Sequence, residues 1–446
     1  MVRRILRNSI RTTVDTRGLI AFSLVLAMVT TGFAASKRSR GYVTTPTELK
    51  AVRAKADRGI QPYRSAVSQL LTFASTASPD NLDDPVAPNP EYWPFPPAAG
   101  KQECHGSGKP LFLAKGSPLV QAKAFAYVIT GDNRYAADVR KHLLELAGTD
   151  GYGGEEYSGG NQCILNLSWY LPGWIIAADL IEDYKGWSDA DKRTFQEWLA
   201  TEAYRKVEWA SDHRSNNWGS AGSATAAMIA DYLNGSGIAL VGWDDEERES
   251  AEAFERAKRR QIDRLNGNLY MDNYGCPDSR GEGIRPDGGI PWELGRGKSR
   301  CSGRWIVKKD DSWTYTMTFL QGALMHAELL LRRGDRSLYD NVTPEGAGSI
   351  LKAIHFVVAN PNNRAKSVEW KETAKPQLEF AYRYYRDPAI GRELRVGQRN
   401  RYIGRRSVQM LHFGTLTHGF SPEETASSPP TIPPPGAQLR AGTASR

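Results

Sequence analysis

The chain has 446 residues, of which 40% are hydrophobic and 24% charged, so it can form one large domain or two to three ordinary domains. Its formal net charge is +8, but the basic residues form no dense patch and no nucleic-acid-binding motif, which argues against a nucleic-acid partner. The sequence has no H-E-x-x-H motif and no C-x-x-C pair, so it predicts neither a metal site nor a cofactor.

The N-terminal 35 residues have the pattern of a secretory signal. Five arginines precede the uncharged run Gly18 to Ala35, which ends in small residues, and cleavage is expected after Ala34. The alternative is an uncleaved membrane anchor, because a run of about 18 residues is long enough to span. Residues 1–34 carry five arginines and one aspartate, so cleavage would lower the net charge to +4. We therefore expect a secreted or periplasmic protein whose mild basicity suits an acidic substrate.

The remaining sequence predicts one helical domain between two irregular segments. Residues 36–115 are expected to be irregular because 83–110 are rich in proline and glycine. From residue 116 onwards apolar residues recur at spacings of three and four, which is typical of amphipathic helices. The composition of 421–446 is that of a disordered tail. Helices are predicted on both sides of Gly131-Asp132-Asn133, and over 164–183, 189–208, 219–234, 247–267, 313–333 and 347–359.

The succession of helices predicts an all-α fold. Strand-like alternation is scarce, and helices joined by glycine-rich turns are typical of paired-helix solenoids or toroids. The sequence has no exact repeat of 20–50 residues, so any repeat is structural only. We therefore expect an (α/α) toroid, or incomplete barrel, of paired antiparallel helices over 116–420, in a monomer.

The four cysteines are open to two interpretations. In an oxidising compartment they can form two disulfides, and a bond between Cys276 and Cys301 would close the loop that contains residues 287–297. The alternative is that all four are buried free thiols.

The first candidate site is the stretch DHRSNNWG. Asn216 and Asn217 stand directly before a helix of small apolar residues, flanked by His213 and Trp218. Adjacent asparagines before a helix are most often caps and turn formers. The alternative is that a carboxamide hydrogen-bonds a substrate carboxylate, with Asn216 and Trp218 as further substrate contacts.

The second candidate site is the stretch DGGIPWELGRG at 287–297 together with the helix that follows Asp311. Four glycines and a proline disfavour a helix or a strand here, yet the stretch holds two carboxylates and Arg296. Glu293 is expected to pair with an arginine and fix the loop, with direct substrate contact as the alternative. Tyr315 lies in the first turn of the following helix, where a tyrosine is usually packed.

A third group of residues lies in the stretch NQCILNLSWYLPGW. Gln162, Asn166 and Trp169, with Tyr170 and Trp174, can form a platform for sugar rings. Their spacing of three and four fits core packing equally well, and both alternatives stay open.

The order of these motifs resembles a known enzyme family. Asn-Asn before a helix, then Asp-Gly-x-x-Pro-x-Glu-Leu-x-Arg-Gly, then a tyrosine at a helix start, is similar to the alginate lyases of the poly(mannuronate) type and their glucuronan-cleaving relatives. The stretches 124–147 and 377–388 also resemble that family, so the likeness covers 116–388. It implies an (α/α) toroid that cleaves an acidic polysaccharide.

The resemblance implies catalytic roles for Asn217, Arg296 and Tyr315. The chain departs from the family pattern at Trp218, where the family has a histidine, and His213 is the nearby imidazole that can replace it. The gap between Arg296 and Tyr315 is longer than in the family, which makes Tyr274 the reserve for the tyrosine.

The chemistry of β-elimination explains why these residue types suit a polyuronate. Removal of the C5 proton requires donors that neutralise the neighbouring carboxylate, which Asn217 can supply. In mannuronate and glucuronate the C5 proton and O4 lie on the same face, so one group can serve as base and then as acid. Tyr315 fits this role if the guanidinium of Arg296 lowers its pKa from about 10. The glycines of the 287–297 stretch are expected to let the backbone approach the sugar.

Two alternatives remain at this stage. A glycoside hydrolase would need two carboxylates about 5–9 Å apart, for which Asp287 and Glu293 are the pair. An exported uronan-binding or polymer-export protein would keep the fold without catalysis. The sequence leaves open the choice between mannuronan and glucuronan and between endo and exo cleavage.

Overall fold

The computed structural model describes residues 39–76, 111–148, 162–269, 283–294, 311–359, 368–395 and 410–421 of the unit Ser39–Arg446. These residues are mostly helical. The strands found in them are β1 (Leu240–Val241) and β2 (Glu247–Arg248), an antiparallel pair with Leu240 opposite Arg248. The prediction of an all-α fold is therefore confirmed.

The helices are, in chain order, α2 (Pro46–Asp57), α3 (Tyr63–Thr76), α4 (Leu111–Thr130), α5 (Asn133–Ala147), α6 (Gln162–Leu180), α7 (Asp189–Trp198), the π-helical turn η3 (Leu199–Ala203), α8 (Tyr204–His213), α9 (Asn217–Leu233), α10 (Ser250–Asn266), α11 (Pro291–Leu294), α12 (Asp311–Arg332), α13 (Ile350–Ala359), α15 (Val368–Tyr385), α16 (Pro388–Arg395) and α17 (Gly414–His418).

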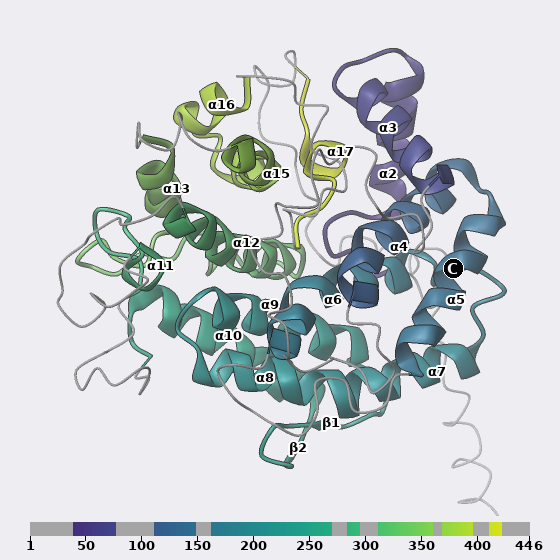
Figure 1. The fold of residues 1–446 in the computed structure, drawn as a ribbon, viewed down its shortest axis with the longest axis horizontal. Coiled ribbons are helices and arrows are strands. Elements are labelled where there is room, and N and C mark those ends of the chain that lie inside the picture. Colours follow the sequence, from purple (N-terminus) through teal and green to yellow (C-terminus); the bar gives the residue numbers. More distant parts are fainter. Residues whose placement is uncertain are drawn as a thin grey trace, which may run out of the picture. The chain divides into compact units, whose positions relative to one another are not determined.

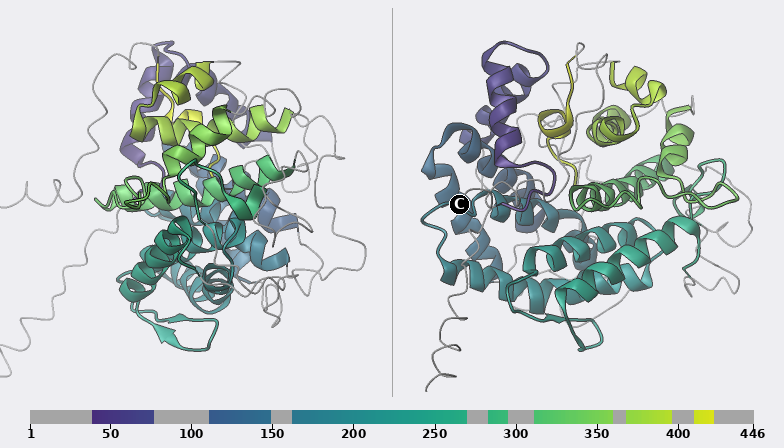
Figure 2. Two further views of the ribbon diagram at one scale, coloured as in Figure 1. Left: turned by 90° about the vertical axis from the view of Figure 1, so that its left-hand side faces the viewer. Right: turned by 180° about the vertical axis from the view of Figure 1, so that it is seen from behind.

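Successive helices pack side by side around a closed circuit. Helix α4 packs against α6, α6 against α9, α9 against α12, and α12 against α15. Helix α17 then packs against α15 on one side and against α2 and α3 on the other, and α2 and α3 return to α4 (Figure 1, Figure 2). Helices α5, α8 and α10 pack against α4 or α9 as the second members of helix pairs. This arrangement is the (α/α) toroid that the sequence predicts.

Small residues allow α9 to contact four other helices. All residues from 219 to 233 are buried. A Cβ on Gly222 would lie 2.8 Å from the backbone of Val207 in α8, and one on Gly322 of α12 would lie 2.6 Å from the backbone of Ala221. Glycine at these two positions therefore lets α8 and α12 approach the backbone of α9 directly.

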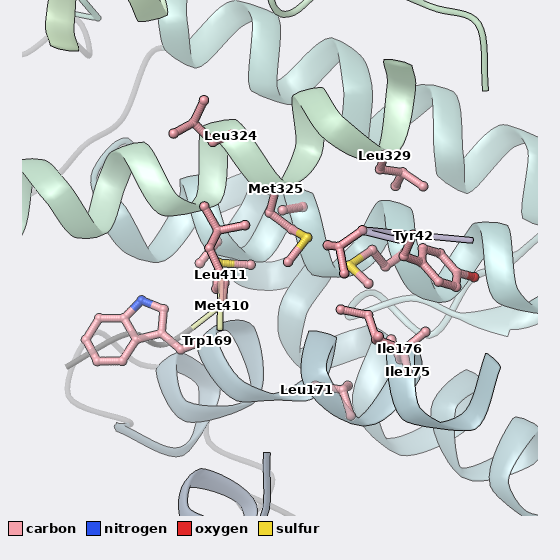
Figure 3. Close-up of a cluster of buried hydrophobic side chains, with 14 of the residues drawn as sticks. Tyr42, Trp169, Leu171, Ile175, Ile176, Leu324, Met325, Leu329, Met410 and Leu411 are labelled. Atoms are coloured by element: carbon pink, nitrogen blue, oxygen red, sulfur yellow. The ribbon is translucent and has the colours of Figure 1, made fainter. Parts of the chain in front are cut away.

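The core between α6 and α12 is apolar. Figure 3 shows side chains of α6, α12 and the C-terminal segment converging there, including Leu171, Ile175, Ile176, Leu324, Met325, Leu329, Met410 and Leu411, all of them buried. Within the described residues, α6 is the helix whose length and hydropathy would suffice to cross a membrane. In this fold 94% of its apolar window is buried, which is what a core helix requires.

Helices α6, α9 and α12 run in the same direction. Asp179, near the end of α6, accepts hydrogen bonds from the backbone N–H groups of Arg40 and Gly41. Arg333, just after α12, donates to Asp231 near the end of α9 at 2.7 Å and also to the carbonyls of residues 40 and 41. The C-terminal ends of all three helices therefore lie against one segment, and their N-terminal ends lie together at the opposite end.

Buried hydroxyl groups fix the register of these parallel helices. Ser220 Oγ of α9 donates to the carbonyl of Phe319 in α12 at 2.8 Å, and Thr225 Oγ1 donates to the carbonyl of Ser168 in α6 at 2.7 Å. The first turns of α9 and α12 therefore lie on the same side of the Ser220–Phe319 contact.

Five charged or titratable residues, of which Glu328 and His418 are buried, join the first and last helices of the domain. Arg332 of α12 lies 3.0 Å from Glu48 of α2 and 2.7 Å from Glu328, while His418 of α17 lies 3.1 Å from Glu328 and Arg383 of α15 lies 3.5 Å from Glu48. We call these five residues the closure network. Burial raises the pKa of Glu328, but His418 and Arg332 outweigh this and bring it down to about 2. Burial lowers the pKa of His418 to about 4, against the opposing effect of Glu328.

The structure corrects the expectation for the N-terminal part of the chain. Residues 36–115 were expected to be irregular, but α2 and α3 occupy much of 46–76 and α4 begins at Leu111. The missed signal is a capping box at the start of α2, where Thr45 and Glu48 cap each other's backbone N–H groups and Pro46 follows the cap. The expected signal segment 1–35 and nearly all of the tail 421–446 lie outside the described residues.

The predicted helices over 116–359 are found, with small shifts at their ends. The predicted junction at 131–133 is confirmed, because α4 ends at Thr130 and Asp132 caps α5. The predicted helix 189–208 runs on to His213 through the π-helical turn η3.

Candidate active site

The first residue of α9, Asn217, is held by Glu293 of α11. Its backbone N–H donates to Glu293 Oε1 at 2.5 Å, and its side-chain Nδ2 lies 3.3 Å from Glu293 Oε2. Both residues are buried, with 1% and 0% of their surface exposed. A carboxylate is favoured at this position because the first backbone N–H groups of a helix have no partner within the helix. The contact fixes α11 against the N-terminus of α9.

Glu293 also determines which way the Asn217 amide faces. A carboxylate accepts hydrogen bonds and does not donate them, so the amide nitrogen must face Glu293 and the amide oxygen must face away. Asn217 Oδ1 is buried and has no hydrogen-bond partner among the described residues. A buried polar atom without a partner is costly, so it indicates a position that a ligand or water completes. Asn217 thus keeps one amide N–H and its oxygen for a bound molecule.

A fully buried arginine fixes the turn that precedes Asn217. Arg264 of α10 donates to the carbonyl of Arg214 from Nε at 3.1 Å and Nη2 at 3.0 Å, and to the carbonyl of Ser211 at 2.6 Å. Its remaining N–H groups donate to neutral oxygens, including Ser223 Oγ and Gln261 Oε1 at 2.8 Å. Burial lowers the pKa of Arg264 to about 9, so it stays protonated at neutral pH. The C-terminus of α8 is thereby fixed in place.

The guanidinium of Arg214 lies near two indole rings in this turn. Its guanidinium carbon is 5.1 Å from the centroid of Trp209 and 5.2 Å from that of Trp218. Arg214 is 6% exposed. Two flat rings restrict the guanidinium to one region and favour its charge through cation–π attraction. The turn therefore presents a fixed positive charge three residues before Asn217.

His213 belongs to a neighbouring aromatic cluster. Its ring stacks on Trp209 with centroids 5.2 Å apart and meets the edge of Trp243 at 4.5 Å, and Nδ1 lies 3.1 Å from the carbonyl of Trp209. Trp243 in turn donates from Nε1 to Asp212 at 3.0 Å. The described contacts of His213 thus point towards Trp243, whereas those of Arg214 point towards Trp218 on α9.

Tyr315 lies at the same end of the domain as Asn217. Helices rise about 1.5 Å per residue, so Asn217 is about 4.5 Å before Ser220 along α9 and Tyr315 is about 6 Å before Phe319 along α12. Because Ser220 and Phe319 are in contact and the helices are parallel, both first turns face the same end. Tyr315 is half-buried there. Asn217, Glu293 and Tyr315 are therefore brought to the same end by three separate elements.

Solved structures with the same arrangement of helices are alginate lyases. One from Bacteroides ovatus superposes with a TM-score of 0.52 at 18% identity, over 81% of this chain and 97% of that chain. Alginate lyase A1-III from Sphingomonas species A1 superposes with a TM-score of 0.52 at 15% identity, over 87% of this chain and 98% of that chain. No protein-family model and no curated protein sequence matches the chain.

The chain shares the fold of these two alginate lyase structures. At these identities the likeness concerns the path of the backbone and assigns no role to an individual residue. The superpositions cover 97% and 98% of the two lyase chains, so this chain contains nearly the whole of the fold that they share.

Several predicted site residues lie in parts of the chain that the structure does not describe. Arg296 and Tyr274 lie outside the described residues, as does the side chain of Gln162. Cys276 and Cys301 also lie outside them, so their pairing stays a prediction. Cys163 at the start of α6 is disulfide-bonded, which rules out the free-thiol alternative for this cysteine.

The other predicted substrate contacts differ in their surroundings. Asn216 caps α9, because its Oδ1 accepts from the backbone N–H of Trp218 at 3.1 Å. Trp169 is 6% exposed and lies beside Met410 and Leu411 in the core, which favours the packing alternative for this ring (Figure 3). Asn166 is half-buried near the start of α6, and a sugar contact there stays a prediction.

Gly288, in the 287–297 stretch, packs against another part of the domain. Gly288 has φ +91°, and a Cβ there would lie 2.1 Å from the carbonyl of Lys352 in α13. Gly288 therefore lets the loop pack onto α13, and an approach of the loop backbone to a sugar stays a prediction. Asp287 Oδ1 accepts from the backbone N–H of Gly289 at 2.9 Å, which tightens the same turn.

Sequence reasoning missed Arg214, Arg264 and Trp209. Arg264 lies in an amphipathic helix where an arginine is normally solvated, so its burial gave no local signal. Arg214 and Trp209 lie within the stretch around Asn217, and their separation of five residues gives no sign that the Arg214 guanidinium lies over the Trp209 ring. Among the described residues no group of three or more His, Cys, Asp or Glu side chains is placed to hold a metal ion.

Proposed function

We propose that the protein is an exported polysaccharide lyase that cleaves a β-1,4-linked polyuronate, mannuronan or glucuronan, by β-elimination. The observation that carries this proposal is the buried Asn217–Glu293 pair at the same end of the alginate lyase fold as Tyr315. An amide with an open oxygen and a remaining N–H, at the same end of the domain as a tyrosine, is suited to a uronate ring.

In the proposed reaction each residue has one task. Asn217 donates its remaining N–H to the substrate carboxylate and so stabilises the charge that develops when the C5 proton leaves. Tyr315 removes that proton as a phenolate and returns a proton to O4 as the glycosidic bond breaks. Arg296 favours the phenolate by its positive charge. The products are a new reducing end and a 4,5-unsaturated uronate at the new non-reducing end.

The contacts of Glu293 weigh against a glycoside hydrolase. A hydrolase would use Asp287 and Glu293 as a pair of carboxylates flanking the glycosidic bond. Glu293 is completely buried with both oxygens engaged by Asn217, and Asp287 holds the backbone of its own turn. Glu293 is better suited to fixing Asn217 than to protonating a glycosidic oxygen.

The decisive experiment measures the products from a panel of polyuronans. Purified protein without residues 1–34 is incubated with mannuronan, glucuronan and a neutral β-1,4-glucan, and the ultraviolet absorbance of unsaturated uronate is followed. Rising absorbance with mannuronan or glucuronan, and none with the glucan, is the expected result. Shortened chains with saturated ends would indicate hydrolysis and contradict the proposal. Binding without shortening would favour a uronan-binding protein.

A further inference from the structure

Arg264 of α10 is a buried cation that lies against the first turn of α9. A Cβ on Gly219 would lie 2.6 Å from its Nη2 atom, so the guanidinium packs on the α9 backbone two residues after Asn217. Arg264 is 1% exposed. Because successive residues of an α-helix are about 100° apart, Gly219 and Asn217 face nearly opposite sides of this turn. Arg264 therefore lies on one side of the turn, and Glu293, which contacts Asn217, lies on the other.

The hydrogen-bond partners of Arg264 within the described part of the chain are all neutral. Its six hydrogen bonds go to backbone carbonyls and to the side-chain oxygens of Ser223 and Gln261. The nearby carboxylate of Asp212 contacts two other arginines of α10 instead, at 2.5 and 2.8 Å. Burial lowers the pKa of Arg264 to about 9, so the guanidinium is charged at neutral pH. Arg264 thus keeps a positive charge without a carboxylate in contact.

Capping of α8 explains the hydrogen bonds of Arg264 but not its charge. Carbonyl oxygens at the end of a helix can be satisfied by any donor, and a neutral amide costs far less to bury than an unpaired charge. The partial negative charge at the end of α8 favours Arg264, but the partial positive charge at the start of α9 opposes it in the same turn. An anionic ligand at the start of α9 would supply the missing counter-charge.

The carboxylate of Glu293 makes a positive charge necessary at this turn if the ligand is an anion. Glu293 accepts from the backbone N–H of Asn217, and two neighbouring carboxylates repel each other. Glu293 therefore disfavours an anion beside Asn217, whereas Arg264 favours it from the opposite side of the turn. Asn217 Oδ1, which is buried and has no partner among the described residues, indicates that a ligand or water is bound there.

We propose that Arg264 is a positioning residue of the Asn217 site whose buried charge selects an anionic sugar ring over a neutral one. This inference rests on the proposed function for the class of substrate. Arg264 does not touch the ligand, because it acts across one turn of α9. A unit charge about 8–12 Å away changes the affinity for an anion by about 10- to 30-fold at an effective dielectric constant of about 20.

The charge can be cancelled without removing Arg264. Gln261 Oε1 accepts from Arg264 Nη1 at 2.8 Å, so Gln261→Glu keeps the shape and places a carboxylate against the guanidinium, which holds it ionised. Gln261→Met is the matched neutral control, because it has a similar length and no charge. Affinities for mannuronan and glucuronan are measured in a Tyr315→Phe background, which is expected to be inactive. Each polymer is also tested after its carboxylates have been reduced to alcohols.

The reduced polymers separate the effect of charge from a structural effect. Gln261→Glu should weaken binding of the charged polymers by about 10- to 30-fold and leave binding of the reduced polymers unchanged. Gln261→Met should bind both kinds of polymer as the parent does, although the loss of its hydrogen bonds should lower the melting temperature. An unchanged affinity of Gln261→Glu for the charged polymers would overturn the proposal. An equal loss on charged and reduced polymers would also overturn it, because the turn itself would then be disturbed.

Substitutions of Arg264 itself give a second measurement. Arg264→Lys keeps the charge, and Arg264→Gln keeps donors without the charge. Arg264→Lys should bind the charged polymers about 10-fold more tightly than Arg264→Gln, and the two should bind the reduced polymers equally. Equal affinities of the two variants for the charged polymers would overturn the proposal. This pair decides the outcome if Gln261→Glu does not fold, and melting temperatures are recorded for every variant.

Failure of this inference can be told apart from failure of the proposed function. A wild-type protein that binds polyuronate without cleaving it, but binds more weakly with Gln261→Glu, would remove the lyase and keep the role of Arg264. Cleavage with kcat and KM unaffected by Gln261→Glu would do the reverse. A wild-type protein that binds neither polymer would overturn both.

Discussion

The two ends of α12 face buried polar groups that are satisfied in different ways. At its C-terminal end the closure network sets Glu328 against Arg332 and His418, and Arg332 also reaches Glu48. At its N-terminal end Glu293 holds only the nitrogen side of the Asn217 amide, and Asn217 Oδ1 has no partner within the described part of the chain. Charges of both signs therefore meet at one end, while a polar atom stays open at the other.

This difference separates stability from binding. Removing one partner from a buried ion pair leaves an uncompensated charge, which destabilises the fold. The paired groups of the closure network therefore stabilise the contacts between the helices that they join. The incomplete amide of Asn217, by contrast, has a buried oxygen that a donor on a bound molecule or a water can complete. We therefore expect substitutions at the N-terminal end to change turnover and substitutions in the closure network to change stability.

The largest effect is expected from Tyr315→Phe. This substitution keeps the ring and its packing but removes the group that carries the proton in both directions. Turnover should fall by at least ~10³-fold, while polymer binding and melting temperature stay near the wild-type values. Steady-state kinetics with a polyuronate and a thermal melt measure both. Near-normal turnover in a folded Tyr315→Phe protein would assign proton transfer to another residue, with Tyr274 next.

The matching experiment in the closure network is Arg332→Met. It removes the shared partner of Glu48 and of the buried Glu328, so unfolding should become easier by about 3–5 kcal/mol. Turnover per folded molecule should not change, because Arg332 is at the opposite end of α12 from Tyr315. Chemical denaturation gives the stability, and kinetics below the melting temperature give the turnover. A large fall in turnover without loss of stability would contradict the division between the two ends.

Two substitutions at the Asn217–Glu293 pair sharpen the comparison. Asn217→Ala removes the amide and should lower turnover by roughly 10²-fold, the usual scale for one charge-stabilising donor.

Glu293→Gln keeps shape and burial but gives the side chain a donor of its own, so the amide group of Asn217 can flip. We expect a loss of about 10-fold in turnover from Glu293→Gln, as for one misdirected hydrogen bond. If Asn217→Ala and Glu293→Gln both had wild-type kinetics, the pair would have no role in the reaction.

The smallest effect is the pH dependence of the closure network. Burial holds the pKa of His418 at about 4, below the ordinary value of about 6.5, so the unfolded chain binds the proton more readily. The stability from His418 is therefore complete above about pH 6.5 and is lost as the pH falls towards 4. Glu328, with a pKa of about 2, adds a further loss below about pH 4.5.

Denaturation curves at several pH values test this dependence. The His418→Gln variant should lose less stability than the wild type between about pH 6.5 and 4, because it has no imidazole to protonate. His355→Gln, which removes a more exposed imidazole 3.0 Å from Asp387, serves as the control for loss of a histidine. Parallel curves for the wild type and His418→Gln would show that His418 does not govern this loss.

The sequence by itself determined the helices and the motifs. Apolar spacing and caps act within a few residues, so the junction between α4 and α5 at Gly131 and Asp132 could be read without a structure. The same local reading failed for α2, where proline and glycine further along the segment concealed the capping box at Thr45. Asn217 and Glu293 were named as candidates because of the stretches in which they lie, and Tyr315 because the order of the motifs resembles the alginate lyases.

Only the tertiary structure decided how those residues combine. Glu293 binds Asn217 across 76 positions in the chain, and Arg264 holds the Arg214 carbonyl across 50. Such contacts depend on which helices become neighbours and in what register, and no local pattern of residues contains that information. The burial of Arg264 and the two rings around Arg214 follow from the packing of α8, α9 and α10, which brings to one turn residues that are spread over three helices.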